Sequence, residues 1–143
     1  MKKEEIIMHY KTILPCEQFV VTGTYALQRM GLVSDSNDID IILVNPTDGA
    51  EEALKRLTNE YPAKTTPGSC GVMAIFMHEQ TKIDVFKESK KIETLMVDGF
   101  EICTALLIFE AKRKMNRPKD WLQLAKIARS IFKQEDFYRY VDK

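Results

Sequence analysis

The sequence predicts a mixed α/β domain, and three observations carry that prediction. Short apolar runs typical of buried strands alternate with segments whose apolar residues recur at helical spacing. Two later runs flank Asp98-Gly99, a dipeptide that strongly favours a two-residue β-hairpin. Helical spacing alone follows from residue 105 onward. The order of helices, strands, antiparallel strands and final helices predicts an α+β (α/β) fold with a mixed sheet.

Length and composition indicate one globular domain. The chain has 143 residues, of which 45% are hydrophobic and 29% charged. We expect a single domain over residues 1–143, with a core over about 16–103 and a helical part over about 104–143. No apolar run approaches the ~20 residues of a membrane helix, and the N-terminus lacks the apolar region of a signal peptide. A cytoplasmic protein without a membrane partner is therefore expected.

The distribution of charge is uneven, although the formal net charge is zero. Residues 34–60 carry seven acids, whereas residues 110–133 carry eight bases. A net charge of zero argues against a protein that binds nucleic acid through its overall charge. The acidic segment and the basic segment either face each other across a cleft or are ordinary solvated helix faces. The odd cysteine count, without metal-ligand spacing, favours reduced thiols at Cys16, Cys70 and Cys103.

The first half of the chain is expected to alternate helices with buried strands. Helices are expected over about residues 3–13, 24–30 and 48–61, and strands over 19–21 and 39–44. Pro15 and Pro62 end the first and third helices, because proline has no backbone N–H. Gly31 is expected to end the second helix, and Thr47 or Asp48 to cap the third.

The second half is expected to form hairpins and then helices. Strands are expected over residues 72–77, 82–87, 92–97 and 100–104, and helices over 105–115, from 118 onward, and over 135–141. Pro118 suits the first position of a helix. That helix is expected to pack through Trp121, Leu124 or Ala125, Ala128 and Phe132.

Three carboxylates are the candidate chemical centre. Asp38 and Asp40 stand two apart at the start of a strand and point to the same face, opposite the apolar residues around them. Asp84 has the same phase on a later strand, so the three would share an open face if the two strands are neighbours. Carboxylate oxygens suit Mg²⁺, as one ion or two. Asp84 serves either as a third ligand or as the base that takes a proton from an attacking hydroxyl.

Gly23-Thr24 stands between an apolar strand and a helix. Free N–H groups at a helix start suit a phosphate. The plainer interpretation is an ordinary strand-to-helix turn, and Asp38 and Asp40 alone could be ordinary surface acids. The combination with Asp84 favours nucleotide chemistry.

These elements together resemble the nucleotidyltransferase superfamily with the DNA polymerase beta-like catalytic fold. Its signature has a glycine followed by a small residue, a spacer, an acid–apolar–acid triplet and a third acid on a later strand. Here these are Gly23-Thr24, thirteen intervening residues, Asp38-Ile39-Asp40 and Asp84. The resemblance implies a mixed sheet with helices on one face and C-terminal helices. It also implies Mg²⁺-dependent transfer of a nucleoside monophosphate from an NTP such as ATP to a hydroxyl, with release of pyrophosphate.

The C-terminal part narrows this resemblance. Glu110-Ala-Lys112 followed by Arg117-Pro-Lys119-Asp120 is similar to the helical region of abortive-infection nucleotidyltransferase toxins. The resemblance implies nucleotide binding by Gly23, Thr24, Lys112, Arg117 and Lys119. It further implies a toxin–antitoxin role, an antitoxin-like partner, and an acceptor such as tRNA, a protein hydroxyl or a small molecule.

The chain also departs from this family pattern. Relatives usually have Gly-Ser or Gly-Gly and a basic residue shortly before the acid pair, whereas this chain has Gly-Thr and the base-free loop Ser34–Asn37. Two alternatives therefore stand beside nucleotidyl transfer. One is a non-catalytic nucleotide- or partner-binding module on the same fold, and the other is phosphodiester cleavage at the same acids.

Overall fold

A mixed β-sheet organises the computed structural model, which describes residues 2–64, 72–115 and 117–131. The strands are β1 (Cys16–Thr22), β2 (Ile39–Pro46), β3 (Val72–His78), β4 (Thr81–Glu88), β5 (Thr94–Val97) and β6 (Phe100–Cys103). The six described strands lie in the order β3-β4-β2-β1-β6-β5. β1 pairs antiparallel with β2 and parallel with β6, and β2 pairs parallel with β4. The mixed sheet predicted from the sequence is confirmed.

Five helices in the described residues complete the fold. They are α1 (Lys3–Ile13), α2 (Gly23–Arg29), α3 (Asp48–Glu60), α4 (Ala105–Met115) and α5 (Pro118–Ile131). The predicted order of elements is confirmed. β1 is longer than the apolar run predicted, because Cys16 already pairs with Pro46 of β2. The short helix expected over 135–141 lies outside the described residues. None of the described helices has the length and apolar character needed to cross a membrane.

The helix ends follow from local chemistry. The Thr47 hydroxyl accepts a hydrogen bond of 3.1 Å from the Ala50 N–H, which satisfies one of the unpaired donors at the start of α3. After α2, Gly31 has a φ of 79°, and the Leu32 N–H reaches the Leu27 carbonyl at 2.9 Å. This glycine-ended turn stops the helix and directs the chain toward β2.

The Asp98-Gly99 hairpin forms as predicted. Both residues have a positive φ, 51° and 86°, which is the conformation required at the two central positions of a type I′ turn. The turn joins β5 to β6 at one edge of the sheet. β3 and β4 form a second antiparallel pair at the opposite edge.

The sheet has a buried face and a more open one. Ile39, Ile41 and Leu43 of β2 are fully buried, and so are Ile83 and Val85 of β4. The residues between them on these strands are partly exposed. Helix α1 contributes the buried side chains of its inner face to the same core; they are Ile6, Ile7 and Tyr10. The two-residue period of the strands therefore separates the core from the acid-bearing face.

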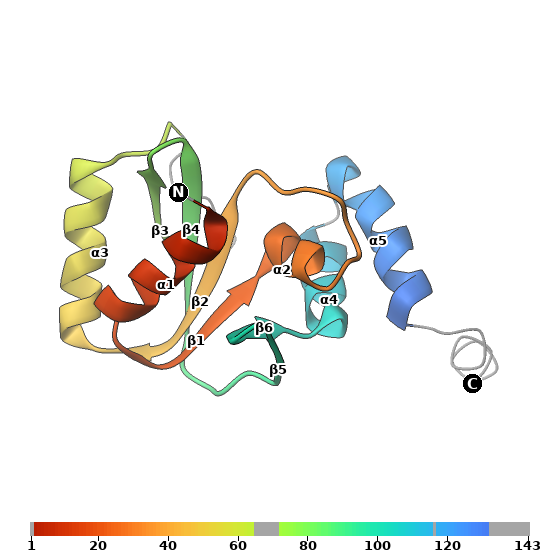
Figure 1. Ribbon diagram of the computed structural model, residues 1–143, viewed down its shortest axis with the longest axis horizontal. Helices are drawn as coiled ribbons and strands as arrows, with labels where there is room; N and C mark the ends of the chain where they lie inside the picture. The colour runs from red at the N-terminus through yellow and green to blue at the C-terminus, as the bar shows by residue number, and fades with distance from the viewer. Residues whose placement is uncertain (1, 65–71, 116, 132–143) are drawn as a thin grey trace.

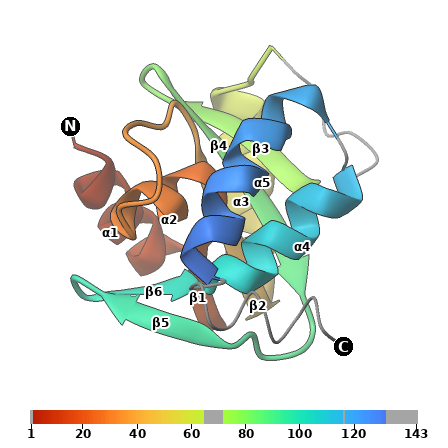
Figure 2. The same ribbon diagram turned by 90° about the vertical axis from the view of Figure 1, so that its right-hand side faces the viewer.

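Helices α4 and α5 stand at the end of the molecule to which β1 leads, and α3 stands at the opposite end (Figure 1). Figure 2 shows α4 and α5 as a pair in front of the sheet. Ile108 of α4 and Ile127 of α5 are buried. The expected packing through Trp121 is wrong, because 57% of Trp121 is exposed. α5 is turned so that Asp120 and Ile127 face inward, and Phe132 lies outside the described residues.

Candidate functional site

Asp40 and Asp84 lie directly opposite each other on neighbouring strands. The parallel pairing of β2 with β4 places Ile39 against Ile83 and Asp40 against Asp84. On the other side, Thr22 at the end of β1 pairs with Asp40. The neighbouring position of the two acid-bearing strands, on which the shared open face depended, is therefore confirmed.

The environment of Asp40 disfavours its charged form. Burial raises the pKa of Asp40 from 3.8 to about 7, and the charge of Asp84, a hydrogen bond with Asp84 and the charge of Asp38 act in the same direction. The charge of Lys112 has the opposite effect and lowers this pKa. Asp40 and Asp84 thus form a close carboxyl pair that holds a proton near neutral pH when no cation is bound.

Asp38 lies further toward solvent, and a lysine stands beside it. The Lys82 ammonium is 3.6 Å from Asp38 Oδ2 and 3.9 Å from Asp84 Oδ2. The Asp38 side chain is 44% exposed, compared with 16% for Asp84. Within the described ranges, no group of three or more His, Cys, Asp or Glu side chains is arranged to hold a metal ion. The structure therefore joins Asp40 to Asp84 closely and leaves Asp38 paired with Lys82.

Gly23 packs directly against the Asp40 carboxylate. Its φ of 69° lies in the left-handed region that favours glycine. A Cβ added there would stand 2.0 Å from Asp40 Oδ2 and 2.9 Å from its Cγ. Both the backbone conformation and the space thus require glycine. Thr24 follows in the first turn of α2, where Thr22 at the N-cap makes no side-chain capping hydrogen bond.

The basic residues predicted to bind nucleotide are held around Asp120. Lys112 Nζ lies 3.2 Å from Asp120 Oδ1, and Arg117 Nε lies 2.6 Å from Asp120 Oδ2. Burial favours the neutral form of Asp120, but the Arg117 hydrogen bond and the Lys112 charge outweigh it and lower the pKa. The Lys119 side chain lies outside the described part of the structure. Lys112 is nevertheless near enough to influence Asp40, so α4 brings a positive charge to the acid face.

Lys82 was not among the residues predicted for the site. The available signal was its position two residues before Asp84, because residues two apart on a strand point to the same face of the sheet. Cys103, expected to be a reduced thiol, is buried, and its thiol lies beside Thr22. Burial raises the pKa of Cys103, and a hydrogen bond with Thr22 opposes that rise. No sequence pattern connected these two residues, because β1 and β6 meet only in the folded sheet.

The donor set at Asp40 and Asp84 fits a magnesium ion in its chemistry. Both residues offer carboxylate oxygens, the ligands that Mg²⁺ prefers. Two carboxylates held in contact repel when both are ionised, and a divalent cation relieves that repulsion. The Gly23 backbone fixes the position of Asp40 from the other side.

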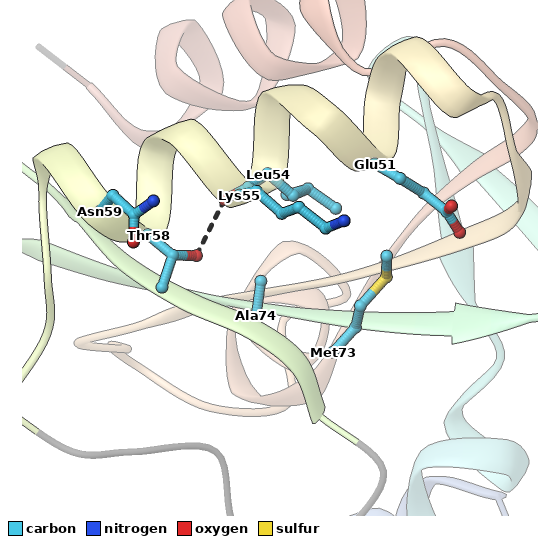
Figure 3. A pocket seen from close by; sticks show the side chains of 7 residues that line it. All are labelled: Glu51, Leu54, Lys55, Thr58, Asn59, Met73 and Ala74. Atoms are coloured by element: carbon cyan, nitrogen blue, oxygen red, sulfur yellow. Dashed lines mark hydrogen bonds between the residues drawn. The ribbon is translucent and has the colours of Figure 1, made fainter.

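A separate cavity of about 460 Å³ lies between α3 and β3 (Figure 3). Leu54 and Lys55 of α3 lie across it from Met73 and Ala74 of β3. None of the residues predicted for the site lines this cavity. The hollow between α3 and the sheet edge is therefore distinct from the carboxylate pair.

Comparison with known proteins bears on the fold. No protein-family model matches the sequence, and no curated protein matches it significantly. The structure is similar to the crystal structure of a candidate nucleotidyltransferase from Thermotoga maritima, with a TM-score of 0.51 and 15% sequence identity. The match covers 88% of this chain and 94% of that one. The chain therefore has a mixed α/β fold of the nucleotidyltransferase type, as its sequence predicts.

Proposed function

We propose that this protein is a metal-dependent nucleotidyltransferase that moves a nucleoside monophosphate from an NTP to a hydroxyl acceptor. One observation carries the proposal: Asp40 and Asp84 lie opposite each other, and the Gly23 backbone is packed against Asp40. Gly23 and Asp84 are 61 positions apart in the sequence, yet both lie next to Asp40 in the folded sheet. The fold shared with the Thermotoga protein supports the same class of reaction.

Each of the predicted site residues has its own role in the proposed reaction. Asp40 and Asp84, with Asp38 beside them, would hold Mg²⁺, which would supply positive charge against the triphosphate. Asp84 also accepts the proton of the attacking hydroxyl. Gly23 and Thr24 receive the triphosphate at the start of α2. Lys112 stabilises negative charge near Asp40, since its ammonium already lowers the pKa of that carboxyl.

The acceptor belongs to the same proposal. The segment that carries these bases is similar to the helical region of abortive-infection toxins, so we propose a toxin-type enzyme with an antitoxin-like partner; the residues are Lys112, Arg117, Lys119 and Asp120. The acceptor is an RNA such as tRNA, a protein hydroxyl or a small molecule. The Arg117 side chain pairs with Asp120 and is 42% exposed, so part of its guanidinium is open to an anionic acceptor.

The test is incubation of the purified protein with labelled NTPs, Mg²⁺ and cell extract. Wild type is expected to transfer label to an acceptor and to lose that activity in EDTA. Asp40→Asn is expected to lower the rate of label transfer at least about a hundredfold, because it removes one carboxylate of the pair that would hold the metal ion. Asp35→Asn is the matched control, since Asp35 is an exposed acid of the preceding loop. Equal labelling by wild type and a folded Asp40→Asn protein would disprove the proposal.

The second candidate is a non-catalytic nucleotide- or partner-binding module. The contact of Lys82 with Asp38 and Asp84 favours it, because an ammonium already balances part of the site's negative charge. Isothermal titration with ATP and Mg²⁺ separates the two candidates. Binding without transfer to any acceptor supports the module. The third alternative, phosphodiester cleavage, is tested by incubating the protein with a labelled RNA and Mg²⁺ and looking for shortened products.

A further inference from the structure

Lys82 brings a positive charge into the group of candidate metal ligands. It stands two residues before Asp84 on β4, and its Nζ lies 3.6 Å from Asp38 Oδ2 and 3.9 Å from Asp84 Oδ2. The Lys82 side chain is 30% exposed. Each of the two carboxylates that it contacts is a predicted metal ligand. The ammonium therefore takes the position between Asp38 and Asp84 that an inorganic cation would otherwise take.

We propose that Lys82 replaces one of the two divalent cations, so that the free protein binds a single metal ion at Asp40 and Asp84. The inference rests on the proposed function and specifies the metal content of that site. An ammonium and a divalent cation repel each other at the same pair of carboxylates. As long as Lys82 keeps both contacts, one position stays closed to a second ion.

The charges of the site agree with one ion. Asp38, Asp40 and Asp84 bring three negative charges when ionised, and Lys82 neutralises one of them. The two that remain are balanced by a single divalent cation. Lys112 does not neutralise one of these three charges in the same way, because its ammonium is paired with Asp120 at 3.2 Å.

The lysines of the same region provide matched variants. Lys87 lies on the same strand and forms an ion pair with Glu51, a residue of α3 outside the carboxylate site. Lys82→Met removes the ammonium and keeps the length of the side chain. Lys82→Arg keeps the positive charge. Lys87→Met removes a lysine charge from β4 without reaching the acids.

The experiment counts bound Mn²⁺ by electron paramagnetic resonance, with no nucleotide present, and circular dichroism checks the fold of each variant. Wild type, Lys82→Arg and Lys87→Met are expected to bind one Mn²⁺, and Lys82→Met is expected to bind two. A Lys82→Met protein that still binds one ion would overturn the inference. Two ions in wild type would also overturn it, while leaving a metal-dependent transferase in place. No Mn²⁺ binding by any variant would instead remove the metal from the proposed function itself.

Discussion

Gly23 is the single residue on which the geometry of the carboxylate pair depends most directly. Gly23→Ala is expected to lower the free energy of unfolding by about 2 kcal/mol or more, because the φ of 69° is strained for alanine and the new Cβ overlaps the Asp40 carboxylate. Activity is expected to fall with it, as Asp40 is displaced. Urea denaturation and the labelling assay measure the two effects.

Gly31→Ala is the matched control for this substitution. Gly31 also has a positive φ, 79°, but a Cβ there would meet no atom within 4 Å. It should cost about 1 kcal/mol from backbone strain alone and leave activity unchanged. Equal stability and equal activity of the two variants would show that the contact between Gly23 and Asp40 does not matter.

The protonation of Asp40 should make stability depend on pH. Below about pH 4 the folded and unfolded states both hold the proton, so the carboxyl contributes nothing. Between 3.8 and about 7 the folded state keeps a proton that the unfolded state has released. The free energy of unfolding therefore falls as pH rises through this window, and the penalty is complete above it.

Asp40→Asn removes this penalty. Measured in EDTA, the stability of the variant relative to wild type should rise on the order of 3 kcal/mol from about pH 4 to about pH 8. The measurement is urea denaturation of both proteins across the pH range. Asp35→Asn, at an exposed position, should show a flat difference. A flat difference for Asp40→Asn as well would mean that the carboxyl titrates normally.

At the scale of elements, Asp120 ties α4 to α5. Asp120 is 2% exposed, and its carboxylate accepts hydrogen bonds from Lys112 and Arg117. Asp120→Ala should lower the free energy of unfolding by about 3 kcal/mol, because it leaves the buried Lys112 ammonium without this partner. Arg117→Ala should cost no more than about 1 kcal/mol, since its side chain is 42% exposed.

A double-mutant cycle tests the pair directly. Lys112→Met combined with Asp120→Ala should be more stable than Asp120→Ala alone, because the double variant buries no unpaired charge. Urea denaturation of wild type, both single variants and the double variant gives the coupling energy. Strict additivity of the two substitutions would show that the buried ion pair is energetically unimportant.

The elements that could be predicted from the sequence are those governed by local chemistry. Asp98-Gly99 requires a tight turn and Pro118 favours a helix start, and both elements form where they were expected. The strand phase of Asp40 and Asp84 also predicted their shared face. That prediction needed only the period of two and the assumption that the strands are neighbours.

The features that could not be predicted depend on contacts between distant elements. α5 carries apolar residues on more than one face, including Trp121 and Leu122, so its spacing does not reveal which face turns inward. In the structure Asp120 lies on the inward face and pairs with Lys112. The contact of Lys82 with Asp38 likewise depends on the register of β4 against β2, which the sequence does not state.

At the scale of the molecule, one base of the C-terminal segment acts on the carboxylate pair. The basic segment over residues 110–133 supplies Lys112, which lies near enough to Asp40 to lower its pKa. Ile108 and Ile127 belong to the same hydrophobic core as Ile39 and Ile83. The C-terminal helices therefore share the hydrophobic core of the sheet.

A shared core should make the whole chain unfold in one cooperative transition. Trp121, the only tryptophan of the chain, lies on α5, so its fluorescence reports the C-terminal helices. Far-ultraviolet circular dichroism reports the sheet and all helices together. In urea the two signals should change with the same midpoint, because α5 cannot leave without exposing Ile127 and the ion pair of Asp120. Asp120→Ala should move both midpoints by the same amount. A fluorescence transition at clearly lower urea than the circular dichroism transition would show that α4 and α5 unfold as a separate unit.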